Sequence, residues 1–115
     1  MGKRLKLSAS QIRPLIQGLG SCLASDQITV DGKRVGYMYR EDPDNSLDSG
    51  WRFFSGEESR GFADNPENFA LYDVNTIANY DPSVLPFLGE PPGSAWSRDQ
   101  SDRFTRESLP VDPDA

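Results

Sequence analysis

The chain has 115 residues, the size of one small domain, and its 18 acidic and 12 basic residues give a formal net charge of −6. The negative charge argues against nucleic acid as a partner, because phosphates are bound by basic surfaces. The absence of histidine and the presence of a single cysteine exclude Ser-His and Cys-His catalysis, histidine-ligated zinc and an internal disulfide.

The chain opens with a basic cluster, Lys3, Arg4 and Lys6, which is not followed by the apolar run of a secretory signal. No stretch reaches the ~18 apolar residues of a membrane span. One unpaired cysteine is typical of a reducing compartment. We therefore expect a cytoplasmic protein without a membrane partner.

Residues 8–18 predict an N-terminal helix. Ser8 and Gln11 have the spacing of a capping box, and apolar side chains at helical spacing follow. Gly18 suits the position after the last turn. Pro14 is tolerated only in a first turn, which favours a later helix start.

Residues 21–40 predict two strands. A β-branched run at 28–30 precedes Asp31 and Gly32, a pair that favours a tight hairpin turn. Beyond the turn, the alternation of residues 37–40 places the two tyrosines on one face of the second strand.

Residues 50–55 predict a further strand. Trp51 and Phe53 lie on one face by alternation, and Arg52 and Phe54 on the other. Aromatic residues on both faces indicate a strand that is buried on both sides, hence central in its sheet.

The second half of the chain alternates short helices and strands. Aspartate or asparagine followed by proline predicts helix starts at 64–66 and 81–82, and Asp73 is a further candidate helix cap. Residues 69–72 and 94–98 predict short strands. Together these patterns predict an α+β fold: one domain over residues 1–98 with a central antiparallel β-sheet, an N-terminal helix and short helices after the central strands. Residues 99–115 are expected to form a mobile polar tail.

The loop over residues 42–48 carries three aspartates, but it lacks the glycine and glutamate that a calcium-binding EF-hand loop requires. We therefore expect a solvated turn, no metal and no cofactor, with an irregular cation site as the alternative. Residues 61–97 contain five acids and no basic residue, which indicates either a solvated face or a patch for a basic partner.

Several runs resemble a bacterial family of unknown function that is grouped with immunity protein 33-like domains. Two of the runs are specific, Gly36-Tyr37-Met38-Tyr39-Arg40-Glu41 and Asp48-Ser49-Gly50-Trp51-Arg52-Phe53. The other matching runs are residues 23–26, 28–32, 72–82 and 93–96. The resemblance covers roughly residues 21–98. It implies a protein that binds and blocks a toxin, and it carries no enzymatic activity.

We therefore predict a non-enzymatic protein-binding module whose partner is a protein such as a basic toxin. The candidate binding residues are Tyr39, Arg40, Glu41, Asp48, Trp51, Arg52, Asp73 and Asp81. The alternative is a small-ligand or cation-binding domain that uses Arg40, Asp48 and Arg52 beside the aromatic residues.

Overall fold

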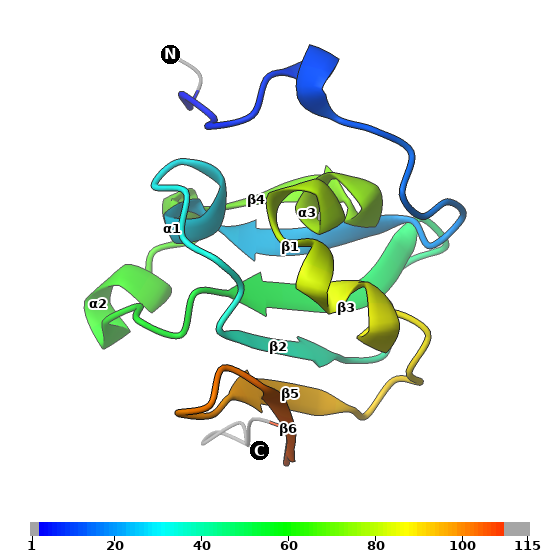
Figure 1. Ribbon diagram of the computed structural model, residues 1–115, viewed down its shortest axis with the longest axis vertical. Coiled ribbons are helices and arrows are strands. Elements are labelled where there is room, and N and C mark those ends of the chain that lie inside the picture. Colours follow the sequence, from blue (N-terminus) through cyan, green and yellow to red (C-terminus); the bar gives the residue numbers. More distant parts are fainter. Residues whose placement is uncertain (1–2, 110–115) are drawn as a thin grey trace.

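The computed structural model describes residues 3–109, which form one six-stranded sheet with short helices (Figure 1). The strand order is β4-β1-β3-β2-β5-β6. The strands are β1 (Ser21–Ser25), β2 (Tyr37–Arg40), β3 (Asp48–Phe54), β4 (Phe69–Asp73), β5 (Ala95–Arg98) and β6 (Phe104–Glu107). The predicted α+β class is confirmed. The predicted antiparallel pairing is wrong for β1 and β3, which run parallel, and correct for the other neighbouring strands.

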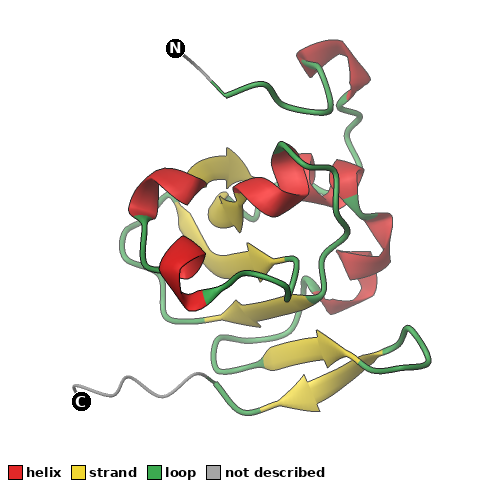
Figure 2. Cartoon of the chain, turned by 90° about the vertical axis from the view of Figure 1, so that its left-hand side faces the viewer, coloured by secondary structure: helices red, strands yellow, loops and turns green. Residues whose placement is uncertain are grey.

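The helices are all short, and none over residues 3–109 is long and apolar enough to cross a membrane. They are η1 (Ala9–Gln11), α1 (Asp26–Thr29), α2 (Arg60–Ala63), η2 (Pro66–Asn68), α3 (Val74–Tyr80) and η3 (Pro82–Phe87). Helices α1, α3 and η3 lie on one face of the sheet (Figures 1 and 2). Their apolar side chains bury Met38, Trp51 and Phe53 of the central strands, all fully shielded from solvent.

The connection from β1 to β2 differs from the predicted hairpin. Ile28 and Thr29 lie in α1, which begins because the Ser25 hydroxyl accepts a hydrogen bond from the backbone N–H of Gln27. Both residues are fully buried in this helix, so packing overrides their preference for strands. Gly32, with φ of +80°, follows the end of the helix and does not form the predicted hairpin turn.

The N-terminal segment forms only one 3₁₀ turn, η1, so the predicted helix over residues 8–18 is wrong beyond this turn. The capping contact from the Ser8 N–H to the Gln11 side chain is present at 2.8 Å. The rest of the segment lies across α3, where the side-chain oxygen of Asn75 accepts hydrogen bonds from the backbone N–H groups of Leu15 and Ile16. These side-chain amides replace the hydrogen bonds that a helix would have supplied.

The chain continues past Arg98 into a last strand. Residues 104–107, which the sequence analysis assigned to a polar tail, form β6 and pair with β5, so the domain does not end at residue 98. Phe104 holds the strand in place: its ring lies 5.2 Å from that of Phe87 and under the guanidinium of Arg98. The part of the predicted tail at 110–115 lies outside the described residues.

Candidate functional site

On the face of the sheet opposite α3, the segment that carries α2 and η2 lies beside Leu23, Tyr39 and Phe54 of the strands. This face, here called the open face, bears the side chains that alternate with the core residues, and strand register brings Leu23, Tyr39 and Arg52 side by side at its centre. At its edge, Leu71 of β4 is 70% exposed. Apolar side chains this accessible on a sheet face are available for contact with another molecule.

Aromatic rings run along the open face. Tyr39 stacks on Phe54 at 5.9 Å, and Tyr37 lies 5.8 Å from both rings. Phe69 of β4 meets Phe54 edge-on at 5.7 Å, and Phe62 of α2 extends the row. All five rings are half-buried, so each keeps part of its surface for a partner.

Arg52 and Asp48 form a buried charged pair on the open face, with 6% and 7% of their side chains exposed. The guanidinium of Arg52 forms two parallel hydrogen bonds with the Asp48 carboxylate, at 2.9 and 2.8 Å. Its Nε donates to Glu41 at 2.6 Å, and Nη1 also donates to the carbonyl of Trp51. The arginine therefore ties the start of β3 to the end of β2.

The contacts within this cluster shift the pKa values of Asp48 and Arg52. Hydrogen bonds from Arg52 hold the pKa of Asp48 well below its usual range, and burial only partly opposes them. The carboxylates of Asp48 and Glu41 likewise raise the pKa of Arg52. Asp44, with 82% of its side chain exposed, lies 3.7 Å from the same guanidinium. Three carboxylates thus surround one guanidinium, and the cluster is net negative.

These charges line a cleft of about 260 Å³, here called the carboxylate cleft. It is formed by Ser21, Leu23, Glu41, Asp44, Asn45, Asp48, Arg52 and Leu71. Leu23 also lines a second hollow, of about 450 Å³, together with Tyr39, Phe54, Ala63, Asp64, Pro66 and Phe69. Because both are lined by Leu23, the two hollows lie next to each other.

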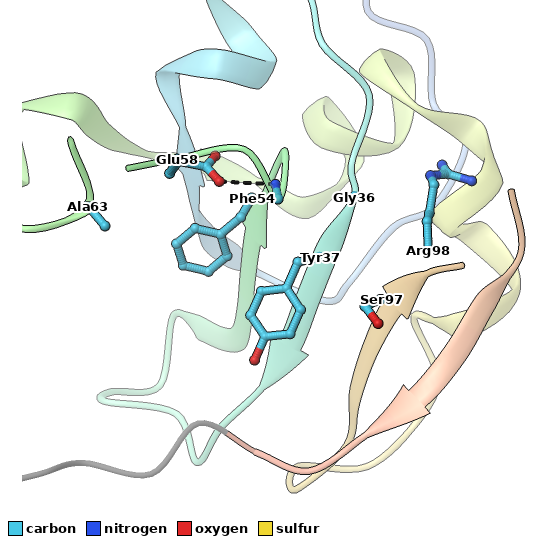
Figure 3. Close-up of a pocket in the computed structure, with 8 residues that line it drawn as sticks. Gly36, Tyr37, Phe54, Glu58, Ala63, Ser97 and Arg98 are labelled. Atoms are coloured by element: carbon cyan, nitrogen blue, oxygen red, sulfur yellow. Dashed lines mark hydrogen bonds between the residues drawn. The ribbon is translucent and has the colours of Figure 1, made fainter. Parts of the chain in front are cut away.

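A third hollow, of about 440 Å³, adjoins the second and shares Phe54 and Ala63 with it. Figure 3 shows Tyr37 beside Phe54 in this hollow, with Glu58 on one side and Arg98 turned away on the other. Burial opposes ionisation of Glu58, but hydrogen bonds from Ser25 and from backbone N–H groups hold its pKa below the usual range. We call the three adjoining hollows the open-face track.

Four of the predicted site residues meet at the track. Tyr39 lines its second hollow, and Glu41, Asp48 and Arg52 line the carboxylate cleft. Asp73 lies at the margin of the same region, because it is paired with Ser21 across β4 and β1. Asp73 also caps α3 by accepting the N–H of Asn75, as the sequence predicted.

The other three predicted residues lie on the helix side of the sheet. Arg40 donates to the carbonyls of Ser49 and Glu90 and lies 5.8 Å from the centre of the Trp51 ring. Trp51 is fully buried. Asp81, 7% exposed, accepts from Arg98 at 2.7 Å. These residues hold the fold together and do not line the track.

Sequence reasoning missed several members of the track, namely Leu23, Phe54, Glu58, Asp64 and Leu71. Alternation along β3 does place Phe54 on the face of Arg52, and this signal was available. The other four come from β1, β4 and the α2 segment, whose positions depend on the strand order. Over residues 3–109, no group of three or more potential ligand side chains has the arrangement of a metal site.

Residues 22–108 match the model of one protein family, described as the Immunity protein Imm33 domain. The match runs from β1 to just beyond β6, so it extends past the region in which the motifs indicated the resemblance. No curated protein and no solved structure matches the chain. Because the matched region spans most of the chain, the protein belongs to the Imm33 immunity protein domain family.

Proposed function

We propose that this protein is a toxin-neutralising immunity protein that works by binding its toxin, without catalysing a reaction. Family membership supports a role in toxin immunity. The observation that carries the binding mode is the open sheet face, where half-buried aromatic rings adjoin a net-negative cleft. Aromatic anchors with complementary charge at their margin are the usual features of a specific protein interface.

The proposed partner is a basic protein. The chain carries a formal net charge of −6, and at the carboxylate cleft the carboxylates outnumber the guanidinium. Such charge raises the association rate with a basic partner and makes binding sensitive to salt. The free, buried Cys22 supports a cytoplasmic site of action, where thiols stay reduced.

The small-ligand alternative is less well supported. It needs Arg40 and Arg52 to have donors free for a ligand, but Arg52 is engaged by Asp48, Glu41 and a carbonyl. Arg40 is directed to backbone carbonyls on the helix side. A thermal-shift panel of cations and small anions tests this alternative, and we expect none of them to raise the melting temperature.

The proposed function is tested by purifying the tagged protein from its native host at low salt and identifying what high salt releases. We expect one stoichiometric protein that arrests growth when it is expressed alone and is harmless when this chain is expressed with it. A partner whose toxicity this chain does not relieve would contradict the proposal, and so would the absence of any toxic partner.

A further inference from the structure

The geometry points to a specific occupant of the open-face track: a short extended segment of the partner protein with a basic residue at each end and apolar residues between them. This inference rests on the proposed function, because it names the part of the toxin that the chain would hold.

The length follows from the strand order. The track crosses from Leu71 on β4 to Ser97 on β5, and β1, β3 and β2 lie between these strands. Neighbouring strands are about 4.8 Å apart, so the crossing spans about 19 Å. An extended chain rises about 3.3 Å per residue, and about six residues therefore fill the track.

The charge of the segment follows from the track's lining residues. Five carboxylates line the three hollows, against two guanidiniums, of which Arg98 is paired with Asp81 outside the track. Carboxylates line both outer hollows: Glu41, Asp44 and Asp48 the first, and Glu58, which also accepts hydrogen bonds from two backbone N–H groups, the third. A basic side chain at each end of the segment would meet them.

The apolar middle of the segment follows from the second hollow. Leu23, Tyr39, Phe54 and Phe69 present partly exposed apolar surface there, and Asp64 lies at its rim. Burying this surface against apolar side chains is favourable by roughly 25 cal/mol for each Å² removed from water. The segment is therefore anchored in the middle by the hydrophobic effect and oriented at its ends by charge.

Other occupants fit less well. A second copy of the chain would bring the same net-negative surface against this one, and nucleic acid or an anionic membrane would be repelled likewise. Residues 110–115 carry two aspartates and no basic residue, so they do not complement the track either. The helix side of the sheet is occupied by the chain's own N-terminal segment, which Asn75 and Asn79 bind.

The inference is tested with a peptide of about six residues that has arginine at both ends and leucine between, added to the isotope-labelled protein at low salt. We expect chemical-shift changes at the amides of Leu23, Tyr39 and Phe54. We expect none in α3 around Ala78. A peptide with glutamate in place of arginine is the control, and we expect it not to bind. Shifts confined to the helix side, or no shifts with the arginine peptide, would overturn the inference.

Charge-reversed variants make the test quantitative. Asp44 and Asp64 are exposed, and Asp44→Lys with Asp64→Lys in one protein should weaken peptide binding at least about tenfold, because like charges then face each other. Asp31→Lys/Glu67→Lys changes the net charge equally at exposed positions that do not line the track, and should leave affinity within about twofold. Equal weakening by both double variants would reduce the binding to non-specific attraction and overturn the inference.

The test of the track and the test of the proposed immunity function can fail independently of each other. If the Asp44→Lys/Asp64→Lys protein still neutralises the toxin as well as the wild type, the track is not the binding site, although the immunity role stands. If the peptide binds at the track but no toxic partner exists, the proposed function fails and the recognition of basic segments remains.

Discussion

Replacing Asp48 with asparagine removes one charge from an almost fully buried ion pair. Asp48 and Arg52 expose 7% and 6% of their side chains, and their two parallel hydrogen bonds are 2.9 and 2.8 Å long. Asparagine keeps one carbonyl acceptor but turns an NH₂ group toward a guanidinium nitrogen. The variant therefore leaves a buried positive charge only partly compensated.

The cost of Asp48→Asn follows from what remains around Arg52. Removing one partner of a buried ion pair costs about 3–5 kcal/mol, because the other charge stays buried. Glu41 still accepts from Arg52 at 2.6 Å, which places the loss near the lower end, at about 3 kcal/mol. For a domain of this size that corresponds to a fall of roughly 10–20 °C in Tm. Glu41→Gln is the matched comparison: the side chain of Glu41 is 46% exposed, and we expect a loss below about 1 kcal/mol.

Urea unfolding followed by tryptophan fluorescence measures both variants, because Trp51 is buried in the folded state. The pH dependence adds a second check. The pKa of Asp48 is lowered in the folded state, so the pair contributes fully above the ordinary carboxyl pKa of ~3.9. Its contribution is lost as the pH falls below that value. The stability gap between wild type and Asp48→Asn should stay constant from about pH 7 to 5 and narrow below about pH 4. A loss for Asp48→Asn no larger than for Glu41→Gln would refute the role assigned to the buried pair.

Three further predictions concern the core and the close contacts. Gly36→Val should abolish folding, measured by circular dichroism, because a Cβ there would collide with the carbonyl of Ser55; a stable variant would contradict the close approach. Trp51→Ala should cost about 3–5 kcal/mol in urea unfolding, because the ring is fully buried; a loss below about 1 kcal/mol would place it at the surface. Burial raises the pKa of the Cys22 thiol, so a thiol reagent at neutral pH should react at the slow rate of unfolding; immediate reaction would show an accessible thiol.

Local patterns in the sequence were sufficient for the elements that carry their own signals. Alternation and aromatic content placed β3, and the caps at Asp73 and Asp81 placed the starts of α3 and η3. Residues 28–30 show where local patterns are not sufficient. Their β-branched side chains favour a strand, but the Ser25 cap and the burial of Ile28 select a helix. Strand β6 was missed because it is an edge strand that buries little apolar surface. Phe104 is the one apolar residue in it.

The candidate site was predictable only in part, because it depends on which strands become neighbours. Alternation correctly separates Arg52 from Trp51, but no local signal shows that Arg52 faces Glu41 and Asp48 rather than a ligand. The parallel pairing of β1 with β3 places Leu23 beside Arg52, and the antiparallel pairing of β4 adds Leu71. These are non-local contacts, and they create the track.

The central claim is that the open face of the sheet binds a toxin. Its most direct test compares the proteins captured from the native host by three baits: wild type, Asp44→Lys/Asp64→Lys and Asp31→Lys/Glu67→Lys. The account predicts one basic, growth-inhibiting protein that the wild type and the second variant retain equally and the track variant loses. Equal retention of that protein by all three baits, or its loss from both variants alike, would contradict the claim.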